Sequence, residues 1–238
     1  MCDDTHIGSV VTAQQLGKSF VSAGGTSTRV FDGVSFSANS GAMTAITGPS
    51  GCGKSTLLYC LSGLERPSAG SVQVLGEKLD EKNQRDLAIF RRSHIGFVFQ
   101  AYNLVPSMTV RDNILLPLTL AGRKSDHGRV SVLMGKFRLD RHDNDTAGSL
   151  SGGEQQRVAL IRTLVADPDV VFADEPTGAL DQSTGQLVFD ELRDFSHRPG
   201  KCVIVVTHDP RLAGQCDSVY TMSNKKLSLS GTIESSTS

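Results

Sequence analysis

The stretch 48-GPSGCGKST-56 constrains this 238-residue chain more than any other part of it. It follows the apolar run 43-MTAIT-47, which predicts a strand, and it opens 54-KSTLLYCLSGL-64, whose apolar residues recur at helical spacing. In such a strand-loop-helix setting, the pattern G-x-x-x-x-G-K-[ST] is typical of a loop that binds phosphate, rather than of a merely flexible loop before a helix. The residues that match it are Gly48, Gly53, Lys54 and Ser55.

The chemistry of this loop explains its composition. Glycines let the backbone curl so that successive N–H groups, backed by the positive end of the following helix, point at one anion. Lys54 adds a full positive charge for the β and γ phosphates, and the Ser55 hydroxyl can ligate Mg²⁺. We expect phosphate to be bound by the whole loop, which consists of Gly48, Pro49, Ser50, Gly51, Cys52, Gly53, Lys54, Ser55 and Thr56.

Cys52 is unusual in the middle of a phosphate-binding loop. The backbone at this position does the binding, so the side chain is either a tolerated small residue or a reactive thiol that ATP would protect from alkylation. The other cysteines form no CxxC pair and are interpreted as reduced packing groups.

Two carboxylates, Asp174 and Glu175, lie at the end of the apolar strand 170-VVFAD-174. Asp174 is placed to hold Mg²⁺, and Glu175 to polarise the water that attacks a γ phosphate. The alternative is an acidic strand end that points into solvent. A phosphate loop with two acids fits a kinase, a GTPase or an ATPase.

Further motifs decide among these classes. The stretch 150-LSGGEQQR-157 resembles the signature sequence of ATP-binding cassette (ABC) ATPases, and 170-VVFADEPTGALD-181 resembles their extended Walker B motif and D-loop. Gln100, after the strand predicted at 95–99, resembles the Q-loop glutamine, and His208, after 202-CVIVVT-207, resembles the switch histidine. The five motifs occur in the family's order and cover most of the chain.

The resemblance implies roles for individual residues. Two cassettes would pair head to tail, so that Ser151, Gly152 and Gly153 of one copy close on the γ phosphate held by Lys54 of the other. A local alternative is that this motif only caps a helix.

His208 would contact the γ phosphate and Gln100 would ligate Mg²⁺, although either one alone would also suit a polar residue at a strand end. Phe20 would stack on adenine, unless it is a core phenylalanine, and Asp181 would lie at the dimer interface.

The alternation of strands and helices predicts the α/β class, a P-loop NTPase core with a mostly parallel sheet. We expect one domain over 1–238, with an N-terminal antiparallel β subdomain joined to the core over about 1–42, an inserted helical subdomain at 101–160 and a frayed serine-rich tail at 228–238. The predicted strands are 7–20, 28–38, 43–47, 71–75, 95–99, 169–174 and 202–207, and the predicted helices are 54–64, 84–92, 110–122, 130–137, 183–195 and a short one after Pro210.

Composition narrows the possible partners. Lys plus Arg is 24 and Asp plus Glu is 25, so the net charge of -1 gives no general reason to expect nucleic acid. Apolar runs are far shorter than the roughly 20 residues that span a bilayer. The first residues lack the features of a secretory signal, which predicts a cytoplasmic protein.

By resemblance, the chain is an ATPase subunit at the cytoplasmic face of the cell membrane, where it would pair with a second copy of itself and with two copies of a separate permease. The segment 99-FQAYNLVPSMTVRDNILLPL-118 is most similar to cassettes that export or extract amphiphiles such as haem, macrolides, peptides or lipoproteins. A regulatory cassette of the cell-division type is the alternative, and soluble cassettes of DNA repair or translation are disfavoured. The stretch 143-DNDTAGSLSGG-153 lacks the proline and the basic or aromatic residue that often precede the signature, which weakens assignment to one subgroup.

Overall fold

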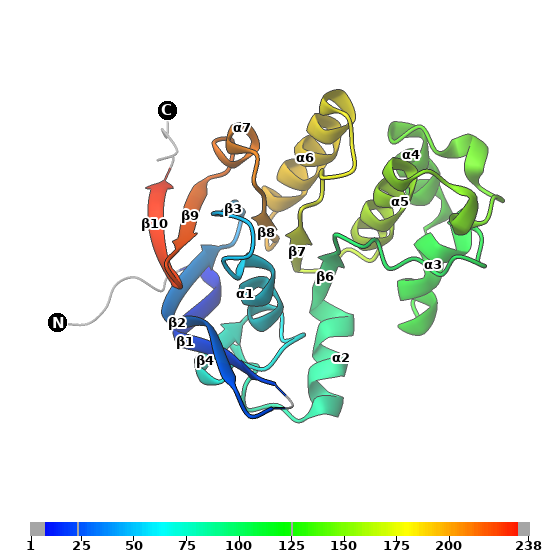
Figure 1. Cartoon of the computed structure of the whole chain (residues 1–238). Coiled ribbons are helices and arrows are strands. Elements are labelled where there is room, and N and C mark those ends of the chain that lie inside the picture. The colour runs from blue at the N-terminus through cyan, green and yellow to red at the C-terminus, as the bar shows by residue number, and fades with distance from the viewer. Residues whose placement is uncertain (1–7, 23, 125, 233–238) are drawn as a thin grey trace.

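The computed structural model describes residues 8–22, 24–124 and 126–232, which form two β-sheets with helices packed around them (Figure 1). The smaller sheet is antiparallel throughout and begins with a long hairpin whose second strand pairs along most of the first. Its strands are β1 (Ser9–Val21), β2 (Ser27–Asn39), β4 (Ala69–Val74) and β5 (Glu77–Lys78), in the order β2-β1-β4-β5.

The larger sheet has six strands in the order β10-β9-β3-β8-β7-β6. All neighbouring pairs are parallel except β10 with β9, which form an antiparallel hairpin at one edge. The strands are β3 (Ala42–Thr47), β6 (Ile95–Val98), β7 (Val170–Asp174), β8 (Cys202–Val206), β9 (Ser218–Ser223) and β10 (Lys226–Thr232).

The central strands are buried on both faces, and their side chains alternate between two hydrophobic cores. Phe172 belongs to the core that contains the antiparallel sheet, α1 (Lys54–Leu61) and α2 (Gln84–His94). Its neighbour Val171 belongs to the core on the opposite face, which contains α5 (Gly152–Val165), α6 (Gln182–Ser196) and α7 (Pro210–Ala213). The parallel sheet is therefore the middle layer of the molecule (Figure 1).

The helices α3 (Val110–Leu120) and α4 (His127–Lys136) pack against α5 and extend the molecule to one side (Figure 1). Two short 3₁₀ turns, Asp140–His142 and Ala147–Ser149, lead from α4 to α5. None of the helices in the described ranges is both long and apolar enough to cross a bilayer.

The fold class predicted from the sequence is confirmed, and so are the strands and helices predicted before residue 215, with ends that shift by a few residues. Helix α1 is shorter than the predicted 54–64, because the chain turns at Gly63, whose φ of +68° suits glycine. The subdomain boundaries themselves stay a prediction.

The prediction of a frayed tail from residue 228 was wrong for residues 228–232, which belong to strand β10. Strands β9 and β10 and the two-residue β5 were missed as well. The turn at Asn224 and Lys225, with φ of +48° and +62°, makes the β9–β10 hairpin, and Leu227 and Leu229 alternate with serines in the pattern of an edge strand. The serines gave this segment the composition of a loop, but its period of two is that of a strand. Residues 233–238 lie outside the described part.

Phe189 tests the core between α6 and the parallel sheet, where its side chain is fully buried. We expect Phe189→Ala to lower the free energy of unfolding by about 3–5 kcal/mol, because the ring leaves a cavity that the sheet cannot close. Val132→Ala on α4, at a side chain that is 70% exposed, is the control and should change it by less than about 0.5 kcal/mol. Equal urea midpoints for the two variants would contradict this view of the core.

Candidate functional site

The glycine-rich loop lies between the end of β3 and the start of α1, as the sequence predicts. Gly48 has φ +141°, and a Cβ there would overlap the carbonyl of Met222 in β9. Gly53 has φ +105°, and a Cβ there would come within 2.6 Å of Val30. The loop can therefore take this path only with glycine at both positions.

Lys54 is the first residue of α1 and is buried beneath the loop. Its Nζ donates hydrogen bonds to the carbonyl oxygens of Gly48 and Pro49, each at 2.9 Å. The first N–H groups of α1 have no partner within the helix and carry its positive dipole end. The loop thus joins a cation and helix N–H groups in one concave turn, which is the chemistry that binds phosphate.

Asp174 ends β7 and reaches across to α1. Its Oδ1 accepts a hydrogen bond from the Ser55 hydroxyl at 3.0 Å, and its Oδ2 accepts one from the Tyr59 hydroxyl at 3.3 Å. Burial raises the pKa of the Asp174 carboxyl above its ordinary value, and the two hydrogen bonds and the charge of Lys54 oppose that rise. Burial, with the nearby Asp174 charge, also raises the pKa of Tyr59, so its hydroxyl is the donor.

The pair Ser55 and Asp174 offers hydroxyl and carboxylate oxygens, the ligands that Mg²⁺ prefers. Within the described ranges no three His, Cys, Asp or Glu side chains gather in a way that would hold a metal ion. This donor set therefore fits a Mg²⁺ ion whose other ligands are phosphate and water oxygens, and does not fit a closed metal cage of protein ligands.

Glu175 follows directly, in a left-handed backbone conformation with φ +49°. Its N–H donates to the carbonyl of Val206 at 3.0 Å, so the chain is held in line with β8 as it leaves the sheet. The Glu175 carboxylate lies 2.9 Å from Nδ1 of His208, which follows β8 and is 71% exposed in its side chain. The structure brings together these two residues, which are separated by 33 positions in the sequence.

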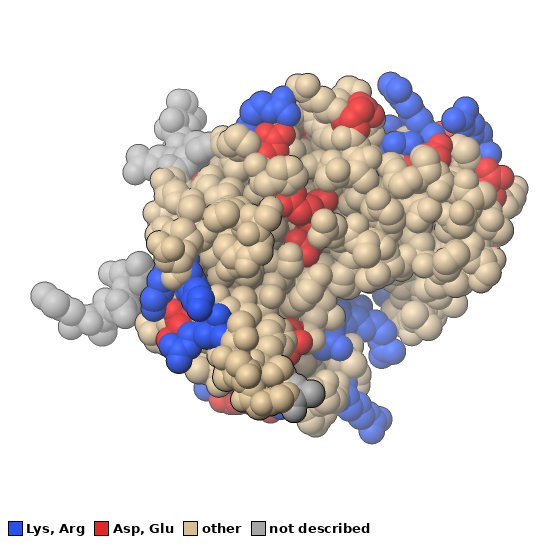
Figure 2. Space-filling view, viewed as in Figure 1, with Lys and Arg blue, Asp and Glu red and all other residues tan. Residues whose placement is uncertain are grey.

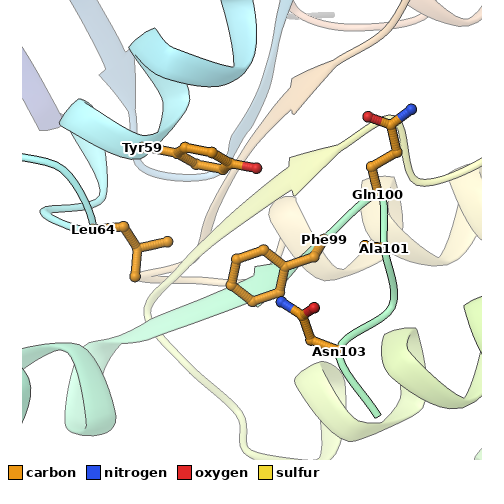
Figure 3. A pocket seen from close by; sticks show the side chains of 6 residues that line it. All are labelled: Tyr59, Leu64, Phe99, Gln100, Ala101 and Asn103. Carbon is orange, nitrogen blue, oxygen red and sulfur yellow. The ribbon is translucent and has the colours of Figure 1, made fainter. Parts of the chain in front are cut away.

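Gln100 is exposed on the segment after β6 and lines a groove of about 480 Å³ (Figure 3). Figure 3 shows α1 supplying one wall of this groove and the segment after β6 supplying the other. The residues that line it are Tyr59, Leu64, Phe99, Gln100, Ala101 and Asn103. Tyr59, one of these lining residues, also donates a hydrogen bond to Asp174.

The signature motif forms the N-terminus of α5, away from the glycine-rich loop in Figure 1. Ser151 is the N-cap, and its side chain and that of Glu154 form a reciprocal capping box. The Ser151 backbone N–H and hydroxyl donate to Glu154 at 2.9 and 2.6 Å, and these bonds lower the pKa of the Glu154 carboxyl. In the single chain, the motif therefore does cap a helix. No hydrogen bond in the described ranges joins the motif to the glycine-rich loop.

Asp181 lines a pocket of about 270 Å³ that it shares with His208, and Phe20 lies on the antiparallel sheet. Asp181 is exposed and caps α6, and hydrogen bonds from Ser183 and Thr184 hold the pKa of its carboxyl well below its usual range. Phe20 is 46% exposed near the end of β1, with Lys18 Nζ 4.7 Å from its ring centre, so it is not a core phenylalanine. An exposed aromatic ring of this kind is available for stacking.

The structure therefore gathers the glycine-rich loop, the two carboxylates and His208 at the carboxyl edge of the parallel sheet, and leaves the signature motif elsewhere. Figure 2 shows a small group of acidic side chains in the middle of this face, near β7 and β8, amid uncharged surface. Sequence reasoning missed Tyr59. The available clue was its spacing of four residues from Ser55, which places both on one side of α1.

Comparisons with known proteins add to this geometry. A sequence profile described as "ABC transporter" matches residues 31–178. An uncharacterized ABC transporter ATP-binding protein of Mycobacterium tuberculosis is 42% identical over 206 residues, which cover 86% of this chain and 83% of the relative. The lipoprotein-releasing system ATP-binding protein LolD of Desulfotalea psychrophila is 38% identical over 213 residues, which cover 89% and 95% of the two chains.

Among solved structures, the chain is similar to the ATP-binding cassette MJ0796. A dimeric structure of a post-hydrolysis state of that cassette, bound to ADP and Pi, matches with a TM-score of 0.86 and 32% identity. The match covers 93% of this chain and 98% of that one. The fold thus agrees with that of a solved ATP-binding cassette.

The cysteines offer a test of the loop's accessibility. Cys52 is half-buried, whereas Cys60, Cys202 and Cys216 are buried, and burial raises the pKa of each of these three thiols to about 12. At pH 8 we expect N-ethylmaleimide to modify Cys52 at least about tenfold faster than those three, because only the thiolate reacts and buried thiols keep their protons. Peptide mass spectrometry over a time course measures the four rates. Modification of the buried three at the rate of Cys52 would contradict the packing described above.

Proposed function

This chain belongs to the ABC transporter family, and from that membership we propose that it is the ATP-binding and ATP-hydrolysing subunit of a transporter whose permease is a separate polypeptide. The observation that carries the proposal is the convergence of Lys54, Asp174 and the Glu175–His208 pair at one edge of the sheet. A cation, a metal-binding carboxylate and a base are the groups that hydrolysis of a phosphoanhydride needs.

Each group at this edge takes one role. The loop at 48–56 binds the phosphates through N–H groups and Lys54. Phe20 stacks on the adenine ring. Glu175 accepts the proton of the attacking water, and His208, 2.9 Å from that carboxylate, orients Glu175 and contacts the γ phosphate.

Mg²⁺ is the cofactor that this donor set fits. Ser55 and Asp174 would hold it, with Gln100 as a further oxygen ligand from the segment after β6. When bound, Mg²⁺ neutralises charge on the β and γ phosphate oxygens.

The ATP site is completed by a second copy of the chain. Ser151, Gly152 and Gly153 lie at the N-terminus of a long helix, which suits an anion, yet they are away from the loop of their own chain. In a head-to-tail dimer they close on the γ phosphate of the partner copy, and Asp181 lies between the two sites. The dimeric form of the cassette MJ0796 supports this arrangement.

The groove of Figure 3 is the surface that we assign to the permease. Leu64 is 42% exposed at its rim, and Tyr59 and Phe99 line its interior. An amphipathic helix that lays its apolar face into such a groove buries both sets of apolar atoms. Docking there holds the chain at the cytoplasmic face of the membrane, with two cassettes on two permease copies.

The transported substrate is an amphiphile, which is exported or extracted from the membrane. A relative named for lipoprotein release supports this class, in which haem, macrolides and peptides are the other candidates. The regulatory alternative of the cell-division type is not favoured. Stimulation of ATP hydrolysis by a lipopeptide, haem or a macrolide, each added to the reconstituted complex, separates these candidates.

Glu175→Gln tests the base. We expect nucleotide affinity to stay within about twofold while turnover falls by about 10²–10⁴, because the amide cannot accept a proton. The variant should accumulate as an ATP-bound dimer in size-exclusion chromatography. Lys54→Ala is the contrasting variant, which should lose nucleotide binding itself. Near-normal turnover in Glu175→Gln would overturn the assignment.

Leu64→Asp tests the groove. We expect about tenfold or greater loss of binding to the permease that co-purifies with the chain, because a carboxylate would be buried against an apolar helix face. ATP hydrolysis by the isolated chain should stay unchanged. The matched control is Leu229→Asp in β10, at an exposed leucine on the edge strand far from the groove. Equal binding by both variants would place the permease elsewhere.

A further inference from the structure

Tyr59 lies outside the sequence motifs described above, yet its side chain contacts the proposed metal site. It lies on α1, four residues after Ser55, so both side chains point to the same side of the helix. That side faces the end of β7, where Asp174 is 1% exposed. Within the described ranges, the Asp174 side chain accepts two hydrogen bonds, one on each oxygen.

Those two bonds fix the plane of the carboxylate. Ser55 donates to Oδ1 and Tyr59 to Oδ2, so a rotation of the carboxylate breaks both at once. Ser55 is itself a proposed ligand of Mg²⁺, whereas among the described residues the Tyr59 hydroxyl bonds only to the carboxylate. The phenol is therefore the donor that orients Asp174 whether or not the metal engages Ser55.

The ring of Tyr59 is held in turn by aromatic packing. Its centroid lies 5.6 Å from that of Phe97 in β6, and Phe97 stacks on Phe99 at 4.1 Å. Tyr59 and Phe99 both line the groove of Figure 3, next to Gln100. One side chain thus touches the metal-binding carboxylate with its hydroxyl and the groove with its ring.

We propose that Tyr59 is a positioning residue of the metal site, which orients the Asp174 carboxylate from the wall of the groove. The proposal rests on the function given above, since it takes Ser55 and Asp174 as the Mg²⁺ site. An occupant of the groove would contact the same side chain that orients this carboxylate. The phenol hydroxyl of Tyr59 thereby sets the affinity for Mg²⁺ without touching nucleotide or metal.

Tyr59→Phe removes the hydroxyl and keeps the ring. The readout is binding of a fluorescent, non-hydrolysable ATP analogue to the purified chain, first in EDTA and then over a Mg²⁺ titration. We expect affinity in EDTA to be unchanged and the Mg²⁺ midpoint to rise about tenfold, the size of effect typical for loss of a partner that orients a metal ligand. An unchanged midpoint would overturn the proposal.

Tyr220→Phe is the matched control. It also removes a phenol hydroxyl that bonds within the chain, here to the backbone of Ser37 at 3.2 Å, away from the carboxylates. Its Mg²⁺ midpoint should equal that of the unchanged chain. A rise equal to that of Tyr59→Phe would show a general effect of losing a buried hydroxyl and would count against the proposal.

A double-mutant cycle shows whether Tyr59 acts through Asp174. In an Asp174→Ala background, Tyr59→Phe should cause no further change in the Mg²⁺ midpoint, because the group that it orients is gone. Independent, multiplying effects of the two substitutions would overturn the proposal. Failure of the unchanged chain to bind the analogue at all would instead refute the proposed ATPase function, and the two failures are thus distinct.

Discussion

The hydrogen bond between Ser55 and Asp174 is the contact on which the site depends. It joins the start of α1, which follows β3, to the end of β7, two strands away in the sheet. Parallel strands present their carboxyl ends at one edge, so residues separated by more than 100 positions meet there. The same edge receives Glu175 and His208 from β7 and β8. The sheet order β3-β8-β7-β6 is therefore what turns scattered motifs into one site.

Much of this site could be predicted because its chemistry needs particular residue types at fixed spacing. Gly48 and Gly53 show this most directly, since the backbone there excludes a Cβ. Tyr59 could not be assigned a role in the same way, because a tyrosine on an apolar helix face suits a core equally well. Its role depends on β7 lying opposite α1, which only the three-dimensional structure shows.

The errors in the fold have a similar origin. Strand β10 was mistaken for a tail because composition was weighed above alternation, and β9 contains one threonine and two serines that hide its pairing with β3. Both strands gain their stability from neighbours distant in the sequence. Local composition does not indicate this stability from distant neighbours. The central strands are buried on both faces, so their apolar runs alone identify them.

Within a single chain, the groups at the site already have partners. Lys54 donates to carbonyls of its own loop, Ser151 donates to Glu154, and Glu175 lies against His208. Under the proposed function, binding of nucleotide would exchange these internal hydrogen bonds for new ones, and such an exchange yields a small net free energy per bond. The proposed site would therefore close only when several exchanges occur together.

The groove is connected by hydrogen bonds to the helix that carries the signature motif. Its second wall, the segment after β6, is tied to α5, because Arg162 donates to the carbonyls of Tyr102 and Asn103 at 2.8 and 2.6 Å. Ser151 caps the other end of the same helix. A displacement of this wall would thus move the helix that carries the signature motif, while Tyr59 in the opposite wall donates a hydrogen bond to Asp174, the proposed metal ligand. A permease seated in the groove would therefore contact Tyr59, which bonds to Asp174, through one wall, and the segment that Arg162 ties to α5 through the other.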